Sequence, residues 1–285
     1  MQQAQTIFVT GATGNQGGAV VRSLLKNGFA VKALTRNASS PEAKLLKGLN
    51  AEIVPGDLNH PEGFADQLRD VSGIFSVQSF ANGTDKEIKQ GIALANLAKT
   101  LRIEFFLFSS VLGADLHSGV PIWESKFTIE NHIRESGLPF CILRPASFFE
   151  NFQIPAVKNR ILKGKLGSPI GRNILQPFLS VQDIGSVTVA IFKNREKYLG
   201  KTISLVAVEM NLDEVASIFS ELLGKEIKYQ QLPMFLTRLI MGRNLYKMFD
   251  WINKNSGRPF WTNEKFNEGL PQLMDFRQWI STVKY

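Results

Sequence analysis

The sequence is poor in cysteine, histidine and tyrosine, and it contains no long apolar run. Of its 285 residues, one is cysteine, three are histidine and four are tyrosine. Because a single thiol cannot form an internal disulfide, Cys141 excludes a disulfide scaffold and favours a reducing compartment. The longest apolar stretches, such as residues 105–108, are far shorter than the ~18 residues that a membrane span requires. No basic segment precedes the first apolar run, so we expect no secretory signal and a cytoplasmic location.

The rare nucleophilic and metal-binding residues form no recognisable catalytic pattern. The three histidines lie far apart in sequence without cysteine or carboxylate at ligand spacing, so we expect no metal site: they are His60, His117 and His132. Cys141 lies in an expected strand, where a buried, unreactive thiol is favoured over a nucleophile. Ser109 and Ser110 have no neighbouring histidine and no nucleophile-elbow glycines, which argues against a hydrolase.

The excess positive charge is confined to the second half of the chain. Residues 1–150 carry 14 basic and 14 acidic side chains, whereas residues 151–285 carry 19 and 11, which accounts for the net charge of +8. Part of the excess lies between Lys225 and Arg258 and could meet phosphates, an acidic partner or an anionic ligand. We favour instead the solvated face of a helix whose apolar side chains point inward: Phe235, Leu236, Leu239, Ile240, Phe249 and Ile252. Without a nucleic-acid motif, no nucleic-acid partner is expected.

Short apolar runs alternate with helical patterns over the first 150 residues. The expected strands span residues 6–10, 30–35, 51–55, 73–78, 105–109 and 140–144. The expected helices span residues 17–27, 41–47, 61–68, 84–101 and 122–136. This alternation predicts an α/β fold of the doubly wound, Rossmann type, with a parallel sheet and ligands at the carboxyl ends of its strands. Residues 1–150 then form the dinucleotide-binding domain.

The pattern becomes less regular after residue 150. Helices are expected over residues 179–193 and 213–223, and a strand over residues 202–208. We interpret residues 151–285 as a smaller α+β lobe for a substrate or partner, interleaved with the edge of the sheet. Three tryptophans in this part either cap a substrate cleft or pack the lobe, and the sequence leaves both interpretations open: Trp251, Trp261 and Trp279.

A glycine-rich loop joins the first expected strand to the first expected helix, and its letters are GATGNQGG. Gly11 permits a sharp turn, Gly14 lets the backbone approach a pyrophosphate, and Gly17 lets the helix pack against the strand. The helix N-terminus supplies free N–H groups and the positive end of the helix dipole. We therefore expect the following loop residues to bind a dinucleotide: Gly11, Thr13, Gly14, Asn15, Gln16 and Gly17.

The end of the second expected strand favours NADP(H) over NAD(H). NAD-binding proteins usually place an acidic residue here to bind the ribose 2′-hydroxyl, whereas this chain has Arg36. Its guanidinium can bind a 2′-phosphate, with Ser39 or Ser40 as hydroxyl donors. At the end of the third expected strand, Asp57 can accept a hydrogen bond from the adenine amino group while Leu58 packs on the ring.

Together these features resemble the NmrA-like family, whose members are atypical short-chain dehydrogenases/reductases. The resemblance rests on residues 9–18, 35–37, 56–57, 88–91, 143–145, 149–151 and 180–185. It implies a Rossmann protein that binds NADP(H) and acts either as a redox-linked regulator of a protein partner or as a reductase of a small molecule. It also implies that the dinucleotide contacts further residues: Arg36, Asp57, Leu58, Gln78, Ser79, Lys89, Lys126, Phe148, Phe149 and Asn151.

The tyrosine of the superfamily's catalytic motif is missing. Reductases of the superfamily use Tyr-x-x-x-Lys and a serine, and the lysine lowers the pKa of the tyrosine so that the phenol can donate a proton. Here residues 122–126 read IWESK, so Ile122 occupies the tyrosine position while Lys126 remains. The resemblance makes Lys126 and Ser110 the candidate catalytic residues, with Ser109 as the other serine that matches.

Three functional hypotheses remain open after the loss of this tyrosine. The one we favour is a protein that binds NADPH and reports the NADPH/NADP⁺ ratio through a partner. In the second, Lys126 itself handles the proton, as in the similar isoflavone and phenylcoumaran reductases. In the third, hydride passes to a quinone-like or enone-like acceptor, which needs no tyrosine. Several aromatic side chains either stack such a flat acceptor or pack the core: Phe80, Trp123, Phe148, Phe149 and Phe152.

Overall fold

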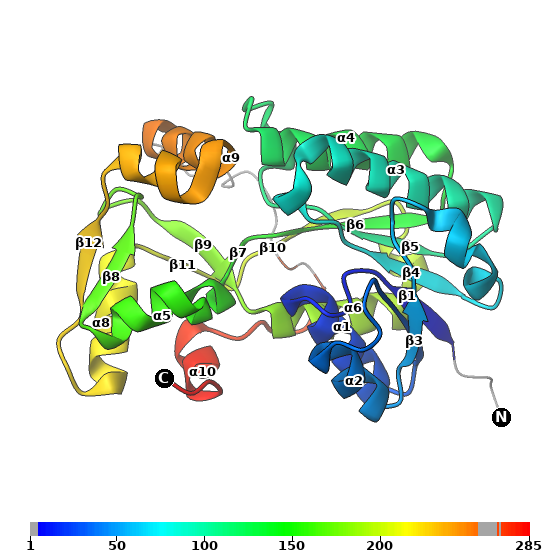
Figure 1. The fold of residues 1–285 in the computed structure, drawn as a ribbon, viewed down its shortest axis with the longest axis horizontal. Coiled ribbons are helices and arrows are strands. Elements are labelled where there is room, and N and C mark those ends of the chain that lie inside the picture. The colour runs from blue at the N-terminus through cyan, green and yellow to red at the C-terminus, as the bar shows by residue number, and fades with distance from the viewer. Residues whose placement is uncertain (1–4, 256–266, 268) are drawn as a thin grey trace.

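A seven-stranded parallel sheet forms the centre of the fold (Figure 1). The computed structural model describes residues 5–255, 267 and 269–285. The strand order is β10-β6-β5-β4-β1-β2-β3. The strands are β1 (Thr6–Val9), β2 (Ala30–Thr35), β3 (Glu52–Pro55), β4 (Gly73–Ser76), β5 (Phe106–Ser109), β6 (Phe140–Pro145) and β10 (Thr202–Leu205). Because the order reverses at β1 and β4, the crevice for a ligand lies at the carboxyl ends of these two strands.

Helices cover both faces of the sheet. α1 (Asn15–Lys26), α2 (Pro41–Gly48) and α6 (Val181–Lys193) lie on one face (Figure 1). α3 (Thr84–Thr100) and α4 (Pro121–Ser136) pack against each other on the opposite face. Nearly every residue of β1, β4, β5 and β6 is buried, as expected for parallel strands covered on both sides. The doubly wound α/β fold expected from the sequence is therefore confirmed.

Where an expected element has shifted, the local chemistry explains the change. The helix expected from residue 179 begins at Val181, because Leu179 belongs to β9 and the Ser180 hydroxyl accepts a hydrogen bond from the Gln182 N–H at 3.1 Å. The helix expected over residues 61–68 is the 3₁₀ helix η1 (Pro61–Leu68). The single strand expected over residues 202–208 is two strands, β10 and β11 (Val208–Met210), which belong to different sheets.

The rest of the second half forms a layer of its own beside the sheet. One small sheet contains β11, β9 (Gln176–Leu179) and β7 (Ser147–Phe148), and another contains β12 (Lys228–Gln231) and β8 (Lys165–Ser168). The helices here are α5 (Pro155–Leu162), α8 (Leu212–Leu223), α9 (Met234–Asn255) and α10 (Phe276–Ser281). The short helix α7 (Arg195–Tyr198) follows α6 and packs with the large sheet instead. The short 3₁₀ turns are η2 (Phe80–Asn82), η3 (Ala114–Leu116) and η4 (Phe149–Gln153). Because β10 and α6 come from this half yet pack with the large sheet, the two halves are interleaved.

An aromatic cluster forms the core of this second layer. Phe149, Phe152, Phe276 and Trp279 pack with ring centroids 5.1–5.6 Å apart. The Trp279 indole N–H donates to Glu150 Oε1 at 3.0 Å, so Trp279 packs the lobe. Of the other two tryptophans, Trp251 makes an edge contact with Trp123 on α4 at 5.1 Å between centroids, and Trp261 lies outside the described residues.

The expectation that the apolar side chains of the basic segment point inward is wrong for the first half of α9. Phe235, Leu239 and Ile240 are 65%, 78% and 75% exposed, whereas Ile252 in the second half is 7% exposed. The two halves differ because Gly242, with a φ of 81°, interrupts the helix between them. Arg258, at the end of the basic segment, lies outside the described residues.

The close packing of α1 on α6 depends on Gly185. A Cβ atom at this position would lie 2.4 Å from Ser23 Oγ and 2.8 Å from the Ala19 carbonyl oxygen. We expect Gly185→Ala to lower the free energy of unfolding by about 1–3 kcal/mol, because the backbone of α1 must move. Gly48→Ala is the control, since nothing lies within 4 Å of its new methyl group. Urea denaturation measures both, and an unchanged midpoint for Gly185→Ala would contradict this account of the packing.

Candidate functional site

The glycine-rich loop connects the end of β1 to the start of α1. Gly11 has a φ of 59°, and its carbonyl oxygen accepts a hydrogen bond from the Gly14 N–H at 2.9 Å. A Cβ at Gly17 would lie 2.3 Å from that same oxygen, so only glycine fits the crossing of the loop and the helix. Gly14 is the N-cap of α1 and provides no side-chain cap. The first N–H groups of α1 are therefore available to an anion. Thr13, Asn15 and Gln16 lie in the same turn.

The adjacent strand ends bring Arg36 and Asp57 close together. Arg36 is exposed directly after β2, and Asp57 is half-buried after β3. The Asp57 carboxylate accepts hydrogen bonds from the backbone and side chain of Asn59, at 2.9 and 2.7 Å. These bonds, with the nearby charges of Arg36 and Lys86, hold the pKa of Asp57 below its ordinary value. The edge thus offers one cation and one ionised carboxylate, with half-buried Leu58 beside them.

Buried polar groups without partners gather at the ends of β4 and β5. The Gln78 side-chain N–H donates to Ser76 Oγ at 2.8 Å. Within residues 5–255, 267 and 269–285, its oxygen atom and the hydroxyls of Ser109 and Ser110 have no hydrogen-bond partner, although all three residues are buried. Because a buried polar atom without a partner is costly, such a group points to a ligand or bound water that completes it. Ser79, by contrast, is exposed, and its hydroxyl accepts from the Ala81 N–H.

Lys126 lies on α4 in a buried ion pair with Glu87 on α3. The two side chains are 6% and 0% exposed, and Lys126 Nζ lies 3.0 Å from Glu87 Oε1. The other Glu87 oxygen accepts from the Ser125 hydroxyl at 2.6 Å. Lys126 also donates to the carbonyl oxygens of Gln78 at 3.0 Å and Ser109 at 3.5 Å. Burial lowers the pKa of Lys126, and the Glu87 charge opposes this shift. The ammonium group therefore has two carbonyl acceptors and one ion-pair partner within the protein.

A second buried ion pair fixes α4 to the sheet. Arg144 on β6 donates from Nε to Glu130 Oε1 at 3.0 Å and from a terminal nitrogen to Glu130 Oε2 at 2.7 Å. Its remaining terminal nitrogen lies 2.6 Å from Asp115, and Arg134 donates to the same Glu130 carboxylate. The carboxylates keep the pKa of Arg144 above its ordinary value despite burial. Glu130 and Lys126 therefore face the sheet from one side of α4.

The remaining predicted site residues differ in how they are placed. Phe148 is half-buried and Asn151 is exposed, and Lys89 lies exposed on α3. Phe149 is fully buried in the aromatic cluster, so its side chain packs the lobe and does not line an open cleft. Ile122 and Trp123 are buried on α4, and Phe80 is exposed in η2. The described residues hold no cluster of three metal-ligating side chains, and burial raises the pKa of the Cys141 thiol to about 12.

The sequence interpretation missed Glu87, Ser125 and Glu130. All three are buried polar residues, which are expected only where partners exist. Glu87 and Lys126 are 39 positions apart in sequence, so no local spacing rule links them. One signal was available, because a lysine expected inside a dinucleotide domain requires a carboxylate nearby.

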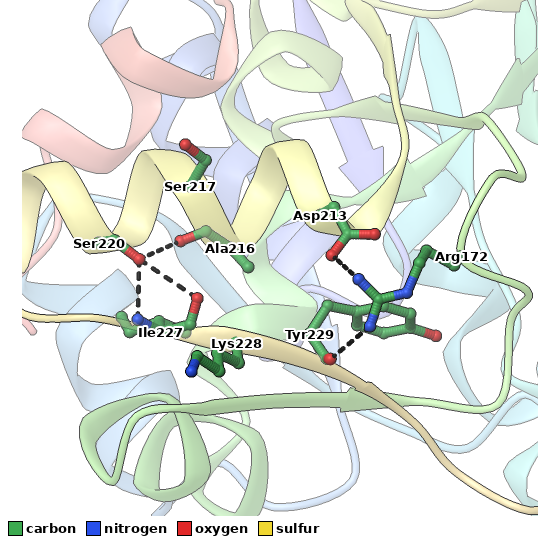
Figure 2. Close-up of a pocket in the computed structure, with 8 residues that line it drawn as sticks. All are labelled: Arg172, Asp213, Ala216, Ser217, Ser220, Ile227, Lys228 and Tyr229. Carbon is green, nitrogen blue, oxygen red and sulfur yellow. Dashed lines mark hydrogen bonds and ion pairs between the residues drawn. The ribbon is translucent and has the colours of Figure 1, made fainter.

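A hollow of about 440 Å³ lies elsewhere, between α8 and β12 (Figure 2). Arg172 stretches across one end, 2.5 Å from Asp213, and donates to the Tyr229 carbonyl oxygen at 3.1 Å (Figure 2). At the other end the Ser220 hydroxyl bonds to the backbone of Ala216 and Ile227. The polar groups named here already have hydrogen-bond or ion-pair partners. They therefore differ from the buried, unpartnered groups of Gln78, Ser109 and Ser110 at the carboxyl ends of the large sheet.

The fold and its glycine-rich first crossover define a protein of the Rossmann class. The NmrA-like family profile matches residues 3–272, and the chain therefore belongs to the NmrA-like family. It is 26% identical to the photosystem II assembly factor Ycf39 of Trieres chinensis, over 89% of this chain and 79% of that protein.

Two solved structures have a similar fold. NmrA, a negative transcriptional regulator in complex with NADP, has a TM-score of 0.75 at 24% identity, over 95% of this chain and 88% of that chain. An NADPH-dependent quinone oxidoreductase from Escherichia coli, complexed with NADPH, has a TM-score of 0.78 at 21% identity, over 97% and 99%. At these identities the likeness concerns the fold.

The Lys126–Glu87 pair leads to a prediction about stability. Lys126→Met leaves the Glu87 carboxylate buried without its counter-charge, so we expect a loss of about 3–5 kcal/mol in the free energy of unfolding. The double variant Lys126→Met/Glu87→Gln removes both charges and keeps an acceptor for Ser125. We expect it to regain most of that loss in denaturation experiments. A double variant that is no more stable than Lys126→Met would show that the side chains do not interact as described.

Proposed function

We propose that this chain binds NADP(H) at the carboxyl ends of its parallel strands and acts as a redox-linked regulator of a protein partner. One observation carries the regulatory part of the proposal. Lys126 is ion-paired with Glu87 and donates to two backbone carbonyls, and Ile122 takes the place of the proton-donating tyrosine. The site therefore has features for binding a dinucleotide but no phenol for delivering a proton.

The residues at the sheet edge fit a nicotinamide dinucleotide. The glycine loop and the uncapped start of α1 suit the pyrophosphate, because they offer N–H groups and no obstructing Cβ. Arg36 suits a 2′-phosphate, since its guanidinium is exposed at the end of β2. The unpartnered groups of Gln78, Ser109 and Ser110 suit the polar end of the ligand. A bound NADPH supplies a hydride at such a site.

Three of the four tyrosines donate hydrogen bonds from their hydroxyl groups to backbone carbonyls elsewhere in the fold. All four tyrosines lie beyond residue 197. Tyr198 is buried and donates its hydroxyl proton to the Gly269 carbonyl oxygen at 2.8 Å. Tyr229 bonds to the Ser168 and Ile170 carbonyls, and Tyr285 bonds to that of Phe152. Tyr198 packs in the core of the large sheet, and Tyr229 and Tyr285 pack in the second layer.

A second candidate function is reduction of a quinone-like or enone-like acceptor. The observation that favours it is the pair of buried, unpartnered hydroxyls of Ser109 and Ser110 beside Lys126, which could hold an acceptor oxygen. Hydride transfer to a quinone forms a hydroquinone anion, which takes its proton from water and needs no phenol. An oxidoreductase of this type is also among the proteins of similar fold.

The cofactor preference can be tested at Arg36. We expect Arg36→Ala to raise the Kd for NADPH by about tenfold to a hundredfold, because a charge-assisted hydrogen bond contributes about 1.5–3 kcal/mol. The Kd for NADH should stay nearly unchanged. Titrations that follow nicotinamide fluorescence measure both values, and Arg277→Ala on α10 is the matched control. An equal increase in the Kd for NADPH and the Kd for NADH in Arg36→Ala would show that this arginine does not recognise the 2′-phosphate.

The complex of the protein with NADPH also allows a test of catalytic turnover. We expect the NADPH-loaded protein to leave aldehydes, ketones and quinones unreduced, because the site lacks a proton donor and its lysine is fully engaged. Absorbance of the reduced nicotinamide reports any oxidation. If quinones alone oxidise the NADPH, the second candidate function replaces the first. Reduction of a simple ketone would contradict both, because it requires a proton from the protein.

A further inference from the structure

An apolar surface on the first half of α9 is exposed and has no role in the dinucleotide site. It consists of Phe235, Leu239, Ile240 and Met241, all exposed within seven consecutive residues. Single exposed apolar side chains are ordinary, but four exposed ones within two turns of one helix indicate an interaction site. We call this group the α9 surface.

A shallow hollow extends the α9 surface toward α5 and β8. Its volume is about 540 Å³. Leu232, Pro233 and Leu236 line one side, and Leu236 belongs to the first half of α9. The other residues that line it are polar or basic: Arg160, Lys163, Lys165 and Gln230. Apolar and cationic side chains therefore lie next to each other along this end of the molecule.

Two of the segments that form this end of the molecule contain no acidic residue, whereas α8 and the loop after it carry Asp213, Glu214, Glu221 and Glu226. Three of these carboxylates are ion-paired, and Glu221 pairs with Arg277. Residues 151–182 include five basic side chains and residues 227–249 include four, and neither stretch has an aspartate or glutamate. Arg172 and Lys228 are paired with Asp213 and with Glu226. The remaining cations give the surroundings of the α9 surface a positive potential that favours an anionic partner.

The second half of α9 anchors this surface to the body of the protein. The Asn253 side chain accepts from the Gly171 N–H at 2.8 Å and donates to the Pro169 carbonyl oxygen at 3.0 Å. Trp251 contacts Trp123 on α4. Beyond the break at Gly242, the first half lies at the periphery of the fold, away from the large sheet (Figure 1).

Charge and polarity decide which occupant fits. A second copy of the chain would bring two positive surfaces together, which is unfavourable. A protein partner would need directional hydrogen bonds across the interface, yet residues 234–241 expose only one polar side chain, that of Arg238, and the adjoining hollow adds three cations and Gln230. A bilayer with anionic lipids attracts the positive surface and needs no directional hydrogen bonds. Projecting apolar side chains enter the interfacial region while lysine and arginine meet the headgroups.

We propose that the α9 surface docks the protein peripherally onto an anionic membrane. Phe235, Leu239 and Ile240 insert into the interface, and Lys163, Lys165 and Arg238 bind headgroup phosphates. No helix among the described residues is long and apolar enough to cross a bilayer.

Co-sedimentation of the full chain with lipid vesicles tests the proposal. We expect binding to vesicles of phosphatidylcholine mixed with phosphatidylglycerol and none to phosphatidylcholine alone. Added salt should weaken the binding, because the headgroup contacts are screened. Leu239→Ser/Ile240→Ser should weaken it at least about tenfold, since two inserted side chains are removed. Both positions are exposed, so the fold should tolerate the change.

Leu199→Ser/Leu222→Ser is the matched control, because it removes two equally apolar, exposed side chains away from α9. This control should bind the anionic vesicles as the unaltered chain does. Lack of binding to those vesicles, or binding that Leu239→Ser/Ile240→Ser leaves unchanged, would overturn the proposal. Analytical ultracentrifugation tests the other occupant, because a dimer that this double variant abolishes would assign the α9 surface to a second copy.

Discussion

The attachment of α4 to the sheet is the constraint on which the candidate site depends. Two ionic contacts made by this helix are buried, one from Lys126 to Glu87 on α3 and the other from Glu130 to Arg144 on β6. Charges placed in a protein interior are tolerated only when paired and hydrogen-bonded, so these contacts permit little variation in the position of the helix. The ends of β4 and β5, which meet Lys126 through their carbonyl groups, are held in the same network.

Under the proposed function, this network would separate binding from chemistry within one crevice. The features suited to a dinucleotide are backbone groups and small residues of the glycine loop, which need no side-chain proton transfer. The residue suited to proton transfer, Lys126, is occupied by acceptors of the protein itself. In a site of this kind, the fraction of protein that holds NADPH or NADP⁺ can follow the ratio of the two nucleotides without any turnover. The periphery around α9 adds a second, independent surface, whose exposed apolar side chains contribute nothing to the core.

The sequence interpretation succeeded where one residue or one short pattern decides the outcome. The loop at Gly11 and Gly17 was predictable because a strand, a turn without Cβ atoms and a helix follow one another directly. It failed for α9, where amphipathic spacing indicated an inward-facing helix. The positive φ of Gly242 divides that helix, and the apolar residues before the break lose contact with the core. The role of Phe149 was also ambiguous in the sequence, because a phenylalanine side chain is equally suited to lining a cleft and to filling a core.

By itself the sequence determined the α/β class, the order of the strands along the chain and the absence of a tyrosine four residues before Lys126. These are local properties, since periodicity, glycine spacing and residue identity act over a few positions. Only the tertiary structure decided that Glu87 pairs with Lys126, that Phe149 packs inside an aromatic cluster and that Leu239 is exposed. The reason is physical: burial and ion pairing depend on which distant segments meet in space, and no short-range pattern encodes those meetings.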